Sequence, residues 1–412
     1  MLEAIKPQKL GHVATDAAAL ALSDAQARLA DFRQKMYLAH PDLQTARAEF
    51  APADLKQLGA TLFRDRPGLV IVSYLVGRDR TLIFVLTAGA KPGDPARLNV
   101  VPVGVTAEKL GVAVDDFVKG CADVGPLPES KDLIAWLLTP AGKSVEDAKE
   151  LVLIPDGVLH RLPFHALRFE DKKYQIERCP VNYAPSVTAL VKMTEVADRR
   201  RKQRAAAADV LVLGITDFGN RARALPGAEP EAKALGTLFE ESVPRPALAL
   251  ILGKEATKSK VREAWSERRY LHFATHGEFN EHAPLFSSIL LTADGKDEGR
   301  LYARDLLDAD LKAELAVLSA CQTGVGRVVG GEGLLGMSWC WFVAGVPSLV
   351  VSHWLVDDAS TPVLMREFYT RLLGGATKAE ALRQAQIKLL KDKETRHPYF
   401  WAPFVLLGDA QK

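Results

Sequence analysis

Short hydrophobic runs alternate with helix-like segments throughout the second half of the chain. Runs typical of buried strands occupy Val210–Gly214, Ala249–Leu252, the residues before Thr275, Leu315–Leu318 and Ser348–Ser352. Helical spacing of apolar residues is found between them, at Glu229–Glu241, Lys258–Glu267 and Leu334–Ala344. This alternation predicts a mainly parallel, doubly wound sheet with helices on both faces. The carboxyl ends of all its strands would then lie along one edge.

The first half has a less regular pattern. A helix is expected from Asp16 to about Leu58, with a break at Pro41, followed by a β-hairpin of Leu69–Val76 and Thr81–Thr87. Two helical stretches, at 107–124 and 131–138, then precede a strand at Leu151–Ile154. We expect three parts: a helical segment at 1–65, a mixed α/β half at 66–200 and a second α/β half at 205–412.

A basic run marks the expected boundary between the two α/β halves. Residues Arg199–Arg204 contain five basic side chains and are followed by four alanines. This is the strongest shift in composition along the chain, and it predicts a boundary loop. The alternative interpretation is the solvated end of a helix.

Composition narrows the class of protein and its compartment. Over 412 residues, 48% hydrophobic and 25% charged residues with a net charge of +2 are typical of an ordinary soluble globular protein, and they indicate neither a nucleic-acid nor a membrane partner. The four cysteines have no C-x-x-C spacing, which argues against a zinc ribbon or a disulfide scaffold. The first residues lack the apolar stretch of a signal peptide, and we expect a cytoplasmic location.

Two of the hydrophobic runs end next to a reactive side chain. One is followed by His276, and the run Leu315–Leu318 is followed by Cys321. A thiol becomes a strong nucleophile when a neighbouring imidazole takes its proton. The two residues are 45 positions apart, close to the interval of roughly 50 in caspases, although the local caspase signature is absent. The pattern predicts a His276–Cys321 pair that performs acyl transfer.

Gly277 adds a second requirement of that chemistry. Without a Cβ, its backbone N–H can approach a tetrahedral oxyanion together with the N–H of Cys321. Each residue also has an ordinary interpretation, because a cysteine after an apolar strand is often an inert buried thiol and a lone histidine is often a core residue. Their joint occurrence at two strand ends favours the catalytic interpretation.

Further motifs make the sequence similar to the CHAT family, a caspase-like module associated with tetratricopeptide repeats and related to separase. The resemblance extends from about Leu69 to Gly408. Besides the His276 and Cys321 motifs, it is carried by Pro155–Phe164, Leu225–Glu229, Gly331–Gly336, Trp354–Asp358 and Tyr399–Leu406.

The resemblance implies a fold, an activity and partners. It implies a caspase-like fold in which 205–412 is a cysteine endopeptidase and 66–200 resembles a degenerate, inactive copy. No cofactor and no metal are implied. The 34-residue helical repeats that usually precede the family's module are absent here. We therefore expect a protein substrate and an activating or repeat-containing protein partner.

The resemblance to separase also points to a basic residue before the scissile bond, at P1. Asp357 and Asp358 match the loop in which an acidic side chain would lie under that residue, and Asp358 corresponds best. A carboxylate there would select Arg or Lys through a charge-assisted hydrogen bond. The alternative is that these aspartates cap a helix beginning near Thr361, and one could cap while the other faces the pocket. With basic selection, 199–204 becomes a candidate self-processing site.

Several other motifs carry less weight. The glycines at 324–331 lack the Lys-Ser/Thr pair of a phosphate-binding loop. His272 and His276 could bind zinc together with His282 or Cys321, but the pattern favours His272 as a core residue or as a residue that supports the site. No third catalytic residue can be named from spacing, and Glu278 and Glu332 are weak candidates.

Two other functional classes stay open at this point. One is a catalytically silent interaction or scaffold module that keeps the fold but not the activity. The other is a small-molecule hydrolase with a doubly wound fold, which the missing Gly-x-Ser-x-Gly motif disfavours. Intact His276 and Cys321 favour the peptidase.

Overall fold

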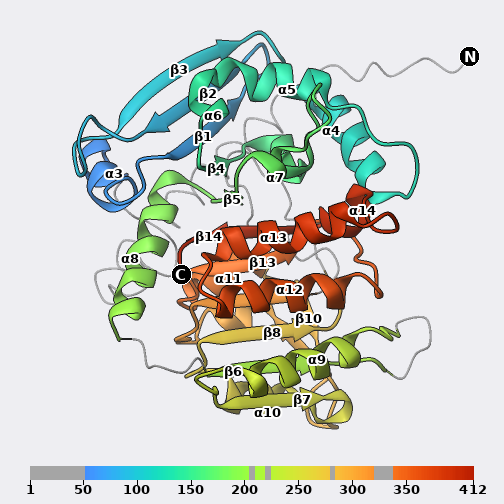
Figure 1. Ribbon diagram of the computed structural model, residues 1–412. Coiled ribbons are helices and arrows are strands. Elements are labelled where there is room, and N and C mark those ends of the chain that lie inside the picture. The colour runs from blue at the N-terminus through green and yellow to red at the C-terminus, as the bar shows by residue number, and fades with distance from the viewer. Residues whose placement is uncertain (1–51, 204–208, 219–223, 279–283, 320–336) are drawn as a thin grey trace, which may run out of the picture. The chain divides into compact units, whose positions relative to one another are not determined.

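The computed structural model describes residues 52–203, 209–218, 224–278, 284–319 and 337–412 (Figure 1). One sheet runs through these residues. Its eleven strands have the spatial order β3-β2-β1-β4-β5-β14-β13-β12-β8-β6-β7. All strands from the second half of the chain are adjacent within it, and so are all strands from the first half.

Five parallel strands form the second-half block of the sheet. They are β6 (Val210–Gly214), β7 (Leu248–Leu252), β8 (Tyr270–Ala274), β12 (Leu315–Ser319) and β13 (Ser348–Ser352). Strands β6, β8, β12 and β13 are buried along their whole length, because helices cover both faces. Full burial explains why they appear as continuous hydrophobic runs rather than as alternating ones. The predicted α/β, mainly parallel fold is confirmed.

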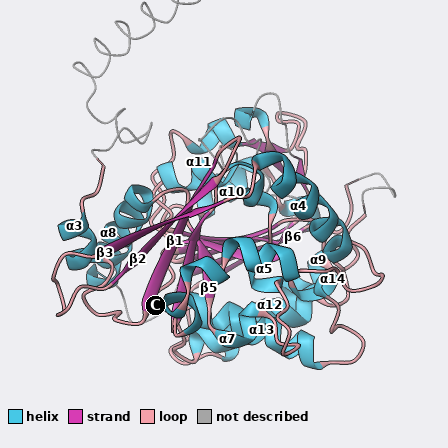
Figure 2. Cartoon of the chain, turned by 90° about the horizontal axis from the view of Figure 1, so that it is seen from above, coloured by secondary structure: helices cyan, strands magenta, loops and turns pink. Residues whose placement is uncertain are grey.

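Helices cover this block on two sides. Figure 2 shows α10 (Lys258–Ala264) and α11 (Met337–Val343) on one side of the strands, and α12 (Thr361–Leu373) and α13 (Lys378–Lys391) on the other. Helix α9 (Ala228–Glu241) packs with α12. Successive residues of β8 point to opposite faces. His272 therefore contacts Tyr369 of α12, whereas the ring of Phe273 lies 5.5 Å from that of Trp341 of α11.

The first-half block runs in the opposite direction. Strands β1 (Leu69–Val76), β4 (Glu150–Ile154) and β5 (Val181–Tyr183) are parallel to one another. Strand β14 (Phe404–Gly408) joins the blocks, since it is parallel to β5 and antiparallel to β13. The carboxyl ends of the five second-half strands therefore lie along one edge, as predicted, whereas those of β1, β4 and β5 lie along the opposite edge.

The edge of the first-half block is antiparallel. Strands β2 (Thr81–Thr87) and β3 (Arg97–Val103) continue from β1 as a meander. The predicted hairpin is present, with the N–H of Gly77 donating to the carbonyl of Arg80 at 3.0 Å. Strand β3 was not predicted, because it is largely exposed and its apolar residues are interrupted by Asn99 and Pro102.

The helices of the first half lie on both sides of its strands. They are α3 (Leu55–Thr61), α4 (Ala107–Ala122), α5 (Lys131–Leu137), α6 (Lys143–Glu146), α7 (Gln175–Arg178) and α8 (Val187–Gln203). A small core lies beneath α3 and α8, where Leu58 and Leu190 pack with Ile71 and Val152. The main core extends from the other face of these strands through the whole second-half block.

The basic run belongs to the last turn of α8 rather than to a boundary loop. Arg200 donates to the main-chain carbonyls of Leu311 and Ala313, and Arg201 donates to Asp409 at 2.9 Å. The boundary-loop interpretation is thus wrong for 199–203, and the alternative of a helix end is correct. A helical backbone with partly buried arginines offers no extended segment for self-processing; residue 204 lies outside the described ranges.

The remaining elements connect these layers. They are a small sheet of β9 (Gly277–Glu278), β10 (Ser288–Leu290) and β11 (Arg300–Tyr302), the short helix α14 (Pro398–Trp401), and 3-10 turns at Thr139–Ala141, Gly157–Arg161, Phe164–Ala166, Gly253–Glu255, Pro284–Phe286 and Ala303–Leu306.

Residues 52–412 form one compact unit. The division at 1–65, 66–200 and 205–412 stays a prediction. Among the helices that the structure describes, none has the length and hydrophobicity that a membrane crossing requires.

Candidate active site

His276 lies just beyond the carboxyl end of β8, and hydrogen bonds to β10 fix Thr275 and the carbonyl of His276 itself. The hydroxyl of Thr275 donates to the carbonyl of Leu290 at 2.7 Å, and the N–H of Leu290 donates to the carbonyl of His276 at 2.8 Å. The imidazole is half-buried, and its centroid lies 5.0 Å from that of the Phe218 ring. The turn from β8 into β9 thus holds the backbone of His276 at the edge of the sheet.

The register between β8 and β12 bears directly on the predicted His276–Cys321 pair. These strands are parallel neighbours, and Ala274 is aligned with Ser319. His276 and Cys321 each follow their aligned residue by two positions. Neighbouring strands lie about 4.8 Å apart, so β8 and β12 end side by side at the same level. Cys321 itself lies outside the described residues.

The pairing of β9 with β10 sets the direction of the N–H of Gly277, a predicted oxyanion donor. In an antiparallel ladder, residue pairs alternate between those that exchange hydrogen bonds and those that do not. His276 and Leu290 are hydrogen-bonded, so the next aligned pair, Gly277 and Ile289, is of the other kind. The N–H of Gly277 therefore points away from β10.

A small cavity opens at the same edge of the sheet. It has a volume of about 20 Å³ and lies where the loops after four strands meet. Its walls include Gly227 and Glu231 after β6, Thr275 after β8, Ser319 at the end of β12, and Asp358 and Thr361 after β13. Strands β6 and β8 are adjacent, and their following connections diverge, so this is a topological switch point, where open α/β sheets bind ligands.

The two aspartates of the predicted P1 loop have different surroundings. The carboxylate of Asp357 accepts hydrogen bonds from the N–H groups of Ala359 and Ser360, at 3.1 and 2.7 Å, and so caps the turn that leads into α12. Asp358 instead is exposed and is one of the residues that line the cavity. Burial raises its pKa, and the nearby charges of Asp357 and Glu231 raise it further, whereas His276 lowers it.

Gly227 allows the Asp358 loop to lie close to α9. A Cβ placed on Gly227 would be 2.5 Å from the main-chain oxygen of Asp358, closer than real contacts of this kind. The backbone of the Asp358 loop can therefore reach the beginning of α9 only because residue 227 has no side chain.

Behind the cavity lies a buried polar network that was not predicted. Glu231 of α9 contacts His272 through Oε1 and Nε2 at 2.8 Å, and the hydroxyl of Tyr369 lies 3.3 Å from Nδ1 of the same imidazole. The prediction that His272 is a core or supporting residue is confirmed, since its side chain is fully buried. Glu231 could have been noticed as an acidic residue in the first turn of a helix that follows a strand end.

Comparison with known proteins places this geometry in a family. The CHAT domain matches residues 127–409, more than half of the chain. The chain belongs to the CHAT domain family. It is also 26% identical over 302 residues to tetratricopeptide repeat protein 28 of Mus musculus, and 24% identical over 306 residues to the protein of that name from Homo sapiens. Each alignment covers 64% of this chain and 12% of the relative.

A solved structure shares the fold of this CHAT protein. The separase of the Saccharomyces cerevisiae separase–securin complex superimposes with a TM-score of 0.55, at 8% identity, over 86% of this chain and 30% of that chain. The predicted caspase-like fold is thereby confirmed. At this level of identity the similarity concerns the fold alone.

The cysteines of the CHAT protein that lie in described ranges are unsuited to nucleophilic catalysis. Cys121, Cys179 and Cys340 are all buried. Burial raises the pKa of Cys179 to about 11 and that of Cys340 to about 12, and it raises the pKa of Cys121 as well. At neutral pH these thiols are protonated and inaccessible, as is typical of structural cysteines.

The weaker candidates of the sequence find other roles or lie outside the described residues. Glu278 forms an ion pair with Arg300, which ties β9 to β11. Glu332 and His282 lie in ranges that the structure does not describe. Within the described ranges, no three His, Cys, Asp or Glu side chains are grouped to hold a metal ion.

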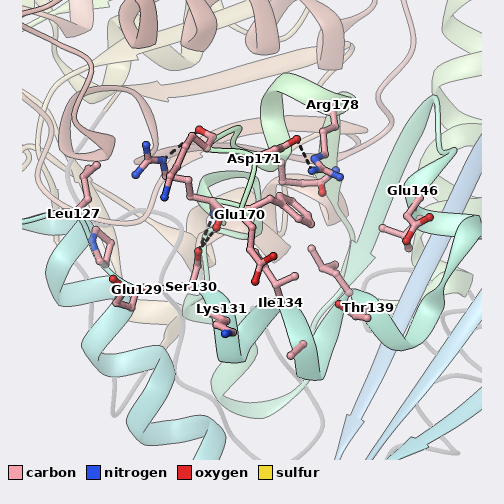
Figure 3. A pocket seen from close by; sticks show the side chains of 18 residues that line it. Leu127, Glu129, Ser130, Lys131, Ile134, Thr139, Glu146, Glu170, Asp171 and Arg178 are labelled. Carbon is pink, nitrogen blue, oxygen red and sulfur yellow. Dashed lines mark hydrogen bonds and ion pairs between the residues drawn. The ribbon is translucent and has the colours of Figure 1, made fainter.

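A larger cavity lies in the first half of the CHAT protein. It has a volume of about 660 Å³ and is bounded by α5 and the segment 168–178 (Figure 3). Some of its polar groups are engaged, since Ser130 exchanges hydrogen bonds with the backbone of Arg168, and Arg178 pairs with Asp171 at 3.0 Å. Four acidic and four basic side chains line it, so its charge favours no particular ligand.

Proposed function

We propose that this CHAT protein is a cysteine endopeptidase in which Cys321 is the nucleophile and His276 is the general base and then the general acid. The N–H groups of Gly277 and Cys321 would stabilise the oxyanion. The observation that supports the proposal is the register of β8 and β12, in which Ala274 is aligned with Ser319, two positions before His276 and Cys321 in the sequence.

The proposed reaction follows from these roles. His276 takes the thiol proton, and the thiolate of Cys321 attacks the scissile carbonyl carbon. The carbonyl oxygen becomes an oxyanion that accepts hydrogen bonds from the two N–H groups. His276 then gives its proton to the leaving amine, so the C–N bond breaks and a thioester remains. Water attacks the thioester with His276 again acting as base, and the acid product leaves.

Asp358 is proposed as the determinant of an Arg or Lys residue at P1. Support comes from its position on the cavity wall, beside the turn that carries His276. Asp357 is also a predicted P1 residue, but its carboxylate is engaged by two backbone N–H groups, so its proposed part is to hold the loop in shape. A carboxylate at the rim of the cavity favours a cationic side chain over a neutral one of similar size.

Regulation by a partner is part of the proposal. The curated relatives are named as tetratricopeptide repeat proteins, and this chain spans 12% of their length. An activating or repeat-containing protein is therefore the proposed partner, and a cytoplasmic location is proposed with it. The same names support the second candidate function, a silent interaction module of caspase-like fold.

A peptide library separates the two candidates. Fluorogenic peptides varied at P1 are incubated with the wild type and with Cys321→Ala, His276→Ala and Asp358→Ala. We expect at least a 10²-fold loss of kcat/KM in Cys321→Ala and His276→Ala. Asp358→Ala should lose about 10²-fold on Arg and Lys peptides and little on neutral ones.

Cys340→Ala is the matched control, because it removes a thiol that is buried and protonated at neutral pH. Its turnover should equal that of the wild type once corrected for the folded fraction. Turnover that persists in Cys321→Ala would exclude the mechanism. A wild type that cleaves no peptide, even with the candidate repeat-containing partner present, would favour the interaction module.

A further inference from the structure

The eleven-stranded sheet has β3 and β7 as its two edge strands, and these differ in how they are protected (Figure 1). Edge strands present unpaired N–H and C=O groups, and proteins commonly block them with charged side chains, proline or bulges. Strand β3 contains Arg97 and Asn99, and its Pro102 has no N–H to donate. Strand β7 has the sequence Leu-Ala-Leu-Ile-Leu, with neither a charge nor a proline. The β7 edge is therefore open to pairing with another strand.

The backbone of β7 forms a ladder on one side. Its neighbour is β6, and the N–H of Val210 donates to the carbonyl of Ala247 at 3.0 Å. Successive residues of a strand direct their N–H and C=O groups to alternate sides. Because Ala247 faces β6, the backbone groups of Leu248, Leu250 and Leu252 face away from it. Among the described residues, none forms a hydrogen bond with these outward groups.

The side chains of β7 are apolar and stay partly exposed. Every residue of β7 keeps some exposure, whereas the neighbouring strand β6 is buried along its whole length. Leu248 and Leu250 face α9, since a Cβ placed on Gly236 would lie 3.7 and 3.2 Å from them. The side chain of Leu250 is 39% exposed. Removing these apolar side chains from water would stabilise an assembly at this edge.

An antiparallel second copy of β7 would satisfy the whole edge. With a two-fold axis at Leu250, this residue lies opposite itself, and Leu248 lies opposite Leu252 of the second copy. Each outward N–H then meets an outward carbonyl. The exposed side chain of Leu250 packs against its own copy on the face that carries α9. The edge is thus complementary to itself.

The charges at the two ends of β7 agree with this arrangement. Arg245 lies five positions before Leu250, and Glu255 lies five positions after it. Antiparallel pairing brings the end that carries Arg245 toward the end of the second copy that carries Glu255. Both side chains are exposed, and their partners within the chain are the surface residues Glu240 and Lys260. Opposite charges across the axis favour antiparallel pairing over a contact between like ends.

We propose that this CHAT protein forms a homodimer in which β7 pairs antiparallel with β7 of a second copy, so that one sheet continues through both. The second-half strands of the two copies then run in opposite directions. Their carboxyl ends, and with them the two His276 residues, lie on opposite edges of the joined sheet. The dimer therefore leaves each proposed active site separate, and it does not depend on the proposed hydrolysis.

Analytical ultracentrifugation of the full chain at about 1–100 μM tests the dimer. Leu250→Lys places two like charges opposite each other, and Leu250→Pro removes an outward N–H without removing a hydrogen bond to β6. We expect each variant to raise the dimer Kd at least about tenfold. Leu98→Lys is the matched control, because Leu98 is an exposed leucine on the other edge strand. It should leave the Kd within about twofold.

Hydrogen exchange on the wild type locates the contact without any variant. The amides of Leu248, Leu250 and Leu252 should exchange more slowly as the protein concentration rises. Urea unfolding shows which variants are folded, and turnover per chain in Leu250→Lys should equal that of the wild type. A wild type that stays monomeric over this range would overturn the proposal. So would a dimer that survives both Leu250 variants, one that Leu98→Lys abolishes, or exchange at β7 that is independent of concentration. Failure of the proposed hydrolysis would leave all these measurements unaffected.

Discussion

The two parallel blocks of this sheet end in very different edges. At the carboxyl ends of β1 and β4, the carboxylate of Asp156 accepts a hydrogen bond from the N–H of Val76 at 2.7 Å and thereby ties the two strands together. At the carboxyl ends of β8, β12 and β13, the corresponding polar groups surround a cavity, and Asp358 borders it with a raised pKa.

The comparison shows how similar topology can be used for stability or for chemistry. The crossover after β4 carries His165, whose imidazole contacts the hydroxyl of Tyr183 at 3.2 Å and the carbonyl of Ala402 at 3.0 Å. Both ring nitrogens are thus engaged in joining the first-half block to the segment before β14. This difference supports the hypothesis that 66–200 is an inactive copy and that chemistry belongs to the second block.

The largest expected effect comes from changing one histidine in each region. His276→Gln should lower kcat/KM by about 10²–10⁴-fold, because it removes a proposed acid–base group. Its free energy of unfolding should change by no more than about 0.5 kcal/mol, as for a partly exposed side chain. His165→Gln should give the reverse, with a loss of about 1–3 kcal/mol of stability and unchanged kcat/KM per folded molecule.

Peptide turnover and urea unfolding, measured on the same preparations, check both variants. The active fraction is taken from the unfolding curve, so that partial unfolding of His165→Gln is not mistaken for lost catalysis. If His165→Gln abolished turnover in fully folded protein, the division between a structural and a chemical edge would be wrong.

The second-half block could be predicted from sequence because its pattern is local. The runs at 210–214, 315–318 and 348–352 are continuous and hydrophobic, as full burial requires, and the structure confirms them as strands. Strand β3 was missed because an exposed edge strand has no such run. The reversed direction of the first block was also missed, since it depends on the pairing of β14 with β13 on one side and with β5, more than 200 residues away along the chain, on the other.

The candidate site divides in the same way. The residues His276 and Asp358 could be named from their positions after strand ends and from the family resemblance. Sequence left open which of Asp357 and Asp358 caps the helix, because adjacent residues differ only in the direction of their side chains. Glu231 was missed because its partner His272 is 41 residues away and on another element.

The seam between the two blocks should make the protein sensitive to acid. Burial lowers the pKa of His160 and of His353 to about 4, and that of His165 to about 3. An unfolded chain binds these protons near the ordinary histidine pKa of about 6.5. Each histidine should therefore contribute its full stabilisation above pH 6.5. As the pH drops from 6.5 to about 4, the free energy of unfolding should fall by on the order of 3 kcal/mol for each histidine.

Urea unfolding at a series of pH values measures this slope. His353→Phe is the informative variant, because both of its ring nitrogens are buried without a partner among the described residues. It should be at least as stable as the wild type at pH 7 and lose less stability at pH 5. His165→Phe is the contrast, since it breaks two hydrogen bonds and should be destabilised at both pH values. If the wild type, His353→Phe and His165→Phe lost the same stability between pH 7 and pH 5, these histidines would not be the cause of the acid sensitivity.

The smallest effect concerns the titration of Asp358 in the open edge. Its raised pKa means that the carboxylate takes up a proton at a higher pH than an ordinary aspartate, and a neutral Asp358 no longer attracts arginine. The ratio of kcat/KM for an Arg peptide over a glutamine peptide should therefore fall as the pH is lowered, with a midpoint above the ordinary pKa of an aspartate. Asp357→Asn keeps an acceptor for the two backbone N–H groups but removes a charge that raises this pKa. It should shift the midpoint to lower pH and change the ratio at pH 7 by less than about twofold.

Asp156→Asn, at the carboxyl ends of β1 and β4, is the control and should leave the midpoint of the pH profile unchanged. If Asp156→Asn shifted the midpoint as much as Asp357→Asn does, the pH profile would report general stability instead of the titration of Asp358.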